Sequence, residues 1–234
     1  MTALSKSIAG VFAGATLAFG LLGSTAAHAS AILTGNFGAD NYAFVYLSTS
    51  ATSLGTLIGS AAGWNPATAI TSTNLADGTY YLNVEVINGD PGSTYSAGGF
   101  LGDFSLTSGA TFSTGSTRLL TGTSGWLASY NNANYNDTVQ AWVAPTGSPL
   151  SEGANGISPW GTISGISSSA NWIWAGGSQA SDGQATEGNQ CAACTIDFQA
   201  KITVPEPAGW TVMLVGLVGL GAAASLRRKQ AAGL

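Results

Sequence analysis

The sequence predicts an all-β fold: a single β-sandwich domain between an N-terminal signal peptide and a C-terminal transmembrane helix. Three observations lead to this prediction. Short runs rich in aromatic and β-branched residues recur between Gly-rich turns. No segment between the two chain ends repeats its apolar residues with a 3.6-residue period. Each end carries a long apolar run next to basic residues, as export and membrane signals do.

The N-terminal end has the three parts of a secretory signal peptide. Lys6 gives the positive region, and residues 8–22 are apolar. Ala27 and Ala29 then form the small-x-small pattern of a signal-peptidase site. We therefore predict cleavage after Ala29, so that Ser30 is the first mature residue. An uncleaved anchor is the alternative, and the cleavage pattern argues against it.

Cleavage there removes His28, the only histidine of the chain. Catalysis by a serine-histidine pair, general-base chemistry by histidine and histidine metal sites are then excluded together. Between residues 30 and 203 two cations, Arg118 and Lys201, face ten carboxylates, a formal charge of 2 − 10 = −8. Such a charge disfavours binding to nucleic acid or to anionic membranes. The length of this region suits one domain with a sizeable core.

Six runs in the exported region are expected to form strands. They are residues 41–48, 79–87, 100–106, 138–143, 171–174 and 195–204. In the last run apolar residues alternate with polar ones, which predicts a half-buried strand. Its apolar set is Ile196, Phe198, Ala200, Ile202 and Val204, and its polar set is Asp197, Gln199, Lys201 and Thr203. Trp172 and Trp174 alternate within their run and are expected on one inward face.

The C-terminal end has three parts in a fixed order. Val204, Pro205, Glu206 and Pro207 come first, an uncharged apolar run covers residues 210–226, and the basic residues Arg227, Arg228 and Lys229 follow. As a helix the run would be roughly 25 Å long, near the short limit for a bilayer core. Because basic residues favour the cytoplasmic side, everything before Val204 is expected outside.

This order resembles the PEP-CTERM sorting signal of Gram-negative bacteria, and the segment is also called an ice-binding protein C-terminal domain, a label that says little about ice. The resemblance implies an exosortase-type processing enzyme, passage through the inner membrane and a producer of extracellular polysaccharide. As with the GPI signal, the apolar tail is then removed after export. The chain divides into a signal peptide (1–29), an exported domain (30–203), a sorting signal (204–229) and a tail (230–234). A permanent tail anchor is the alternative.

The exported domain also resembles the galactose-binding-like jelly rolls, more weakly. The motifs are G-A-D-N-Y-A-F-V-Y-L (38–47), L-A-D-G-T-Y-Y-L-N-V-E-V-I-N-G-D (75–90), G-G-F-L-G-D-F (98–104) and N-W-I-W (171–174). The resemblance implies a jelly-roll-like sandwich. Sugar contacts in that group come from variable loops, so no ligand residue carries over.

Cys191 and Cys194 are the only cysteines. A thioredoxin-like site would need a helix after the first cysteine, and a strand is expected instead. Zinc lacks further Cys or His ligands. We therefore predict a local disulfide in an oxidising compartment.

The remaining candidate residues have a structural interpretation beside a functional one. No two carboxylates stand out as a glycosidase pair. Asp40, Asp90 and Asp137 lie in expected turns, where a structural Ca²⁺ is an option; otherwise no cofactor is expected. Trp64, Trp126 and Trp160 are candidates for stacking on sugars, although core packing is favoured for them.

The sequence thus favours an exported, non-enzymatic protein of the cell surface, outer envelope or extracellular matrix, linked to exopolysaccharide or biofilm. Its expected partners are signal peptidase, an exosortase-type enzyme, the inner membrane before processing, and a polysaccharide. The alternative is a carbohydrate-binding module with a defined sugar site. A glycan-processing enzyme is disfavoured for want of a catalytic set. An ice-binding protein is disfavoured because the many threonines follow no fixed repeat.

Overall fold

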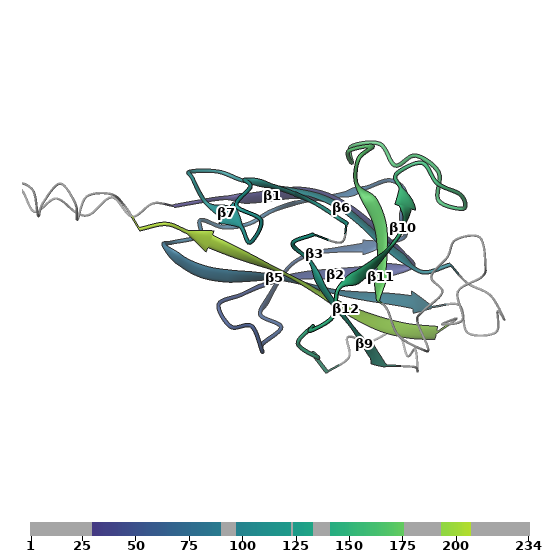
Figure 1. Cartoon of the computed structure of the whole chain (residues 1–234), viewed down its shortest axis with the longest axis horizontal. Coiled ribbons are helices and arrows are strands. Elements are labelled where there is room, and N and C mark those ends of the chain that lie inside the picture. Colours follow the sequence, from purple (N-terminus) through teal and green to yellow (C-terminus); the bar gives the residue numbers. More distant parts are fainter. Residues whose placement is uncertain (1–29, 90–96, 123, 133–140, 176–192, 207–234) are drawn as a thin grey trace, which may run out of the picture.

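The computed structural model describes residues 30–89, 97–122, 124–132, 141–175 and 193–206. These residues form two six-stranded sheets, every strand pairing is antiparallel, and no helix occurs among them (Figure 1). The all-β prediction is confirmed, and the arrangement is that of a β-sandwich.

We call the two sheets the β1 sheet and the β12 sheet. The β1 sheet has the order β10-β11-β6-β1-β4, and β8 pairs with β6. Its strands are β1 (Leu33–Asp40), β4 (Thr68–Thr71), β6 (Gly99–Leu106), β8 (Arg118–Leu120), β10 (Pro149–Ala154) and β11 (Asn171–Ala175). The β12 sheet has the order β3-β2-β5-β12-β7, and β9 pairs with β12. Its strands are β2 (Tyr42–Ser48), β3 (Thr56–Ala62), β5 (Gly78–Gly89), β7 (Thr111–Phe112), β9 (Leu127–Asn132) and β12 (Ala193–Val204).

Strands β5 and β12 form the longest ladder, which runs along the length of the domain in Figure 1. The register extends from Ala193 opposite Gly89 to Val204 opposite Gly78. The apolar residues of the predicted alternation on β12 are all buried, which confirms that face of the strand as a core face. Alternation places them between the sheets, where apolar side chains leave water.

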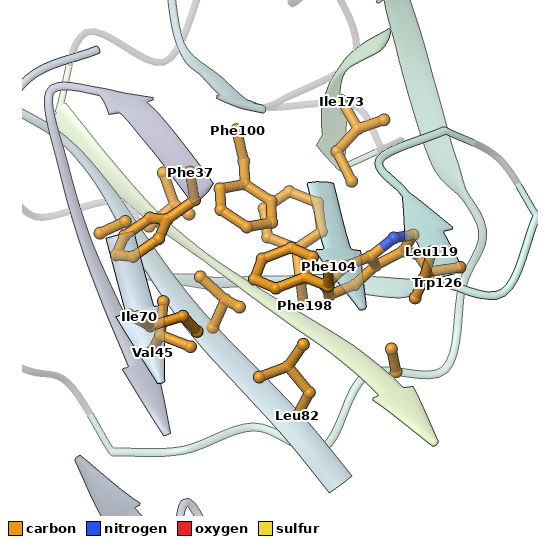
Figure 2. Packing of buried hydrophobic residues seen from close by; sticks show 14 of the residues in the cluster. Phe37, Val45, Ile70, Leu82, Phe100, Phe104, Leu119, Trp126, Ile173 and Phe198 are labelled. Carbon is orange, nitrogen blue, oxygen red and sulfur yellow. The ribbon is translucent and has the colours of Figure 1, made fainter. Parts of the chain in front are cut away.

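The core between the sheets is rich in aromatic rings (Figure 2). Phe100 of β6 lies at its centre, with ring centroids 5.5 Å from Phe198 of the opposite sheet, 5.7 Å from Trp126 and 6.4 Å from Phe37. The Phe100–Trp126 pair is edge-on at 81°, an arrangement that aromatic quadrupoles favour. These contacts join both sheets through one cluster.

Five of the six expected strands match observed ones: β2, β5, β6, β11 and β12. The prediction for residues 138–143 is wrong over 141–143, which form no strand; 138–140 lie outside the described residues. The physical reason is a side-chain contact. The N–H of Val143 donates to the carboxylate of Asp197 at 2.8 Å instead of joining a ladder.

Candidate functional site

Two carboxylates meet on the outer face of the β12 sheet, away from the core. Asp197 of β12 lies directly opposite Glu85 of β5, and both residues are fully buried. Gln199 and Asn83 form the next pair on this face, and both are buried as well. The prediction of a half-buried β12 is therefore wrong for Asp197 and Gln199, and right for the exposed Lys201 and Thr203.

Two stretches of chain cover this polar face. Asn83 donates to the carbonyls of Ser53 and Leu54 at 2.9 and 3.0 Å, and Gln199 donates to that of Ala51 at 2.9 Å. These bonds tie the loop after β2 onto the sheet. Residues 141–147 cover the other part through Asp197 and through a bridge between Gly147 and Ala128.

Asp197 is the centre of the polar face. Its Oδ2 accepts hydrogen bonds from Val143 N at 2.8 Å and from Asn131 Nδ2 at 2.7 Å. Burial, opposed in part by these bonds and assisted by the charge of Glu85, raises the pKa of Asp197 to about 8. Burial and the same two carboxylates raise the pKa of Tyr46 to about 12.

Two carboxylates in directly opposed positions invite comparison with a glycosidase dyad, but the surroundings of this pair do not suit catalysis. A glycoside must reach both carboxyl groups, with room for water or a covalent intermediate. Glu85 and Asp197 have no exposed surface, and residues 141–147 contact Asp197 directly through the N–H of Val143. The pair is a buried polar contact and offers a substrate no access in this structure.

A third covering segment, residues 155–170, packs on part of the outer face of the β1 sheet. The side chain of Asn155 organises it, accepting from Ile163 N at 2.8 Å and donating to the carbonyls of Ile163 and Ile166 at 3.0 Å. Trp160 stacks on Trp172 with ring centroids 4.3 Å apart. These rings belong to a second buried cluster, separate from the core between the sheets.

The structure corrects two expectations for this region. Asp40 was expected in a turn as a possible Ca²⁺ ligand, but it ends β1 and its Oδ2 accepts from Trp160 Nε1 at 2.9 Å. Trp172 and Trp174 are both buried yet lie in different clusters, Trp172 on the outer face and Trp174 in the main core. The sequence could not show this division, because it depends on the 155–170 cover.

The three tryptophans considered for sugar stacking are not exposed platforms. Trp126 and Trp160 are only 2% and 4% exposed, so neither ring presents a face to solvent. Trp126 also donates from Nε1 to the carbonyl of Leu120 at 3.1 Å. Trp64 is half-buried and packs against the second cluster. The core interpretation fits Trp126 and Trp160.

The part of the β1 sheet that the 155–170 segment leaves open forms a polar groove of about 500 Å³. Its polar lining comes from four neighbouring strands: Thr34, Asn36, Thr71, Asp103, Ser105 and Arg118. Arg118 and Asp103 form a two-bond ion pair, at 2.8 Å from Nε and 2.5 Å from the terminal nitrogen. Arg118 is one of only two cations between residues 30 and 203, and this scarcity was the one signal in the sequence that pointed to the groove.

Several predicted residues lie outside the described part of the chain: the signal-peptide residues Ala27 and Ala29, Asp90, Asp137, Pro207, the 210–226 run, the basic residues 227–229 and the tail. Among the described residues, no helix is long and apolar enough to cross a membrane. The described part also contains no cluster of three or more His, Cys, Asp or Glu side chains that could hold a metal.

Cys194 is fully buried on β12, and no described cysteine has a free thiol. Cys191 lies outside the described residues, so its pairing with Cys194 stays a prediction.

Comparison of the chain with protein-family models, with curated proteins and with solved structures found no match. Function must therefore be argued from this molecule alone.

Proposed function

We propose that this protein is an exported, non-enzymatic component of the cell surface or extracellular matrix, delivered by its C-terminal sorting signal. The observation that carries the proposal is where the sandwich begins and ends. Ala31 is fully buried and exchanges two backbone hydrogen bonds with Leu75, at 2.9 and 2.8 Å. The described part of the sandwich therefore begins within two residues of the proposed cut after Ala29.

The other end of the domain has the same relation to the other signal. Val204 is 2% exposed and still paired with Gly78, whereas Pro205 and Glu206 are exposed. A processing enzyme would therefore meet Pro205 and Glu206 of the 204–207 motif just after the last strand, and cleavage beyond this motif would leave the sandwich whole. The proposed partners are signal peptidase and an exosortase-type enzyme in the inner membrane of a Gram-negative bacterium.

The polar groove favours a second candidate, a carbohydrate-binding module on a jelly-roll-like sandwich. Such a module and a matrix protein are compatible, since a surface protein that holds polysaccharide performs both roles. The groove supports a binding role through its polar lining, which comes from four neighbouring strands.

Fractionation of cells tests the proposed route. In cells with a working sorting system, the wild-type protein should leave the inner membrane. Glu206→Ala leaves the apolar run unchanged but alters the 204–207 motif, so the variant should accumulate in the inner membrane. Equal distribution of the two proteins would contradict the proposal and favour a plain tail anchor.

A further inference from the structure

The register of the β1 sheet places polar side chains of the groove in a row across four strands. Thr71 of β4 lies opposite Thr34 of β1, Thr34 opposite Ser105 of β6, and Ser105 opposite Arg118 of β8. With strands about 4.8 Å apart, the row extends over about 14 Å. Asn36 and Asp103, also opposite each other, lie in the adjacent row.

The groove is formally neutral on a strongly acidic domain. Arg118 and Asp103 are its only charged lining residues, and they neutralise each other. A polyanion would meet the domain's net charge of 2 − 10 = −8. A polycation would find no unneutralised carboxylate among the lining residues. An uncharged ligand is therefore favoured.

The hydrogen-bonding capacity of the groove suits hydroxyl groups. The ion pair uses two of the five N–H donors of Arg118, so three remain for a ligand. The hydroxyls of Thr34, Thr71 and Ser105 can each donate and accept. A sugar hydroxyl also does both, whereas an apolar ligand would leave these groups without partners. The side chain of Arg118 is 54% exposed, so it can reach such a ligand.

Hydrogen bonds to the 155–170 segment hold the Arg118–Asp103 ion pair in position. Asp103 also accepts from the backbone N–H of Ser167 at 3.2 Å, and Asn36 donates to the carbonyl of Gly165 at 2.9 Å. Both bonds connect the groove to the 155–170 segment, which borders it. An ion pair as exposed as this one contributes little to stability. We therefore assign the ion pair a different role, which is to hold the guanidinium of Arg118 in line with the row of hydroxyl groups.

From these observations we propose that the groove across β4, β1, β6 and β8 binds a neutral polysaccharide chain. The proposal rests on the surface role proposed above and names its ligand class and its site. With no aromatic ring in the lining, binding depends on hydrogen bonds, and each site should be weak, with Kd on the order of 1 mM. Many copies on one polymer would gain avidity.

The test uses the full chain, purified in detergent, in affinity electrophoresis through gels that contain dextran, galactan or xyloglucan, with alginate as the anionic comparison. We expect retardation by at least one neutral glycan. Arg118→Gln should weaken it about tenfold and Thr34→Val about threefold, because each removes hydrogen-bonding groups from the row.

Two control variants make the same kinds of change on the β12 sheet, away from the groove. Lys201→Gln removes the other cation of the exported region, and Thr203→Val removes an exposed hydroxyl from β12. Both should bind as the wild type does. Thermal unfolding checks each variant, and if Arg118→Gln fails to fold, Thr34→Val decides alone because Thr34 is exposed.

Three outcomes would overturn the site: retardation by none of the neutral glycans, preference for alginate, or binding that the groove variants leave unchanged. None of them bears on tail processing, which is measured by mass. Failure of the groove and failure of the proposed sorting route can therefore be distinguished.

Discussion

Asp197 and Glu85 lie directly opposite each other on the β5–β12 ladder, and both side chains are fully buried. Like charges in directly opposed positions repel, and burial makes two ionised carboxylates more costly still. With its pKa raised to about 8, Asp197 is mostly protonated at neutral pH. The proton permits both carboxyl groups to remain buried side by side.

This proton makes stability depend on pH. The folded-state pKa of Asp197 is about 8, above its ordinary value of 3.8, so the folded chain binds a proton that the unfolded chain releases. The contribution of Asp197 is complete below about pH 4 and is lost as pH rises to about 8. Urea unfolding should show lower stability at pH 8.5 than at pH 5, by an amount on the order of a few kcal/mol.

Asp197→Asn supplies the matching variant, because its amide resembles the protonated carboxyl. It should flatten the decline between pH 5 and 8.5 and be more stable than the wild type at the upper pH. Glu206→Gln, an exposed carboxylate outside the fold, should leave the slope unchanged. A wild type that gains stability over this range would contradict the raised pKa of Asp197.

Phe198 joins the two sheets through its contact with Phe100. Phe198→Ala should lower the free energy of unfolding by about 3–5 kcal/mol, since it removes a fully buried ring and leaves a cavity. Leu57→Ala, at a side chain that is 51% exposed, should change it by less than about 0.5 kcal/mol. Equal effects in denaturant titrations would mean that the core is wrongly located.

Asn155 should be essential for the 155–170 cover. Asn155→Ala removes the acceptor for Ile163 N and the donors to two carbonyls, at a cost of about 1–3 kcal/mol. We expect faster hydrogen exchange over residues 155–170 and a red shift in tryptophan fluorescence as Trp160 becomes exposed. Ser169→Ala, at an exposed position of the same segment, is the control. Unchanged exchange in Asn155→Ala would refute its organising role.

Cys191 and Cys194 should be linked in the exported protein, because an oxidising compartment favours their pairing. Alkylation without reduction, followed by mass spectrometry, should label neither cysteine, and prior reduction should permit labelling of both. Labelling of both without reduction would restore the redox and metal interpretations.

The sequence predicted those strands in which the pattern of apolar and polar residues reflects which face of the sheet is buried. Alternation along β12 identified its core residues because apolar burial acts on each residue separately. It missed the other seven strands, β1, β3, β4, β7, β8, β9 and β10. Of these, β4, β7 and β8 have too few residues to show a period and exist through their partners. It also predicted too much exposure for Asp197, whose burial depends on a covering segment more than 50 residues away.

The candidate site was less predictable than the fold. Thr34, Thr71, Ser105 and Arg118 lie far apart in the chain and form a row only through register. The sequence pointed instead to tryptophans, because aromatic rings are the usual sign of sugar binding. Two of the three proved to be interior, since the fold uses them to fill the two hydrophobic clusters.

The intact mass of the protein at its final destination tests the central claim most directly. The account predicts a chain that begins at Ser30 and has lost roughly the last 25 to 30 residues, so that the 210–226 run and Arg227 to Leu234 are absent. Processing there removes the apolar span but leaves β12 intact. A mature protein whose mass still includes Arg227 to Leu234 would contradict the account and would mean a permanently anchored surface domain.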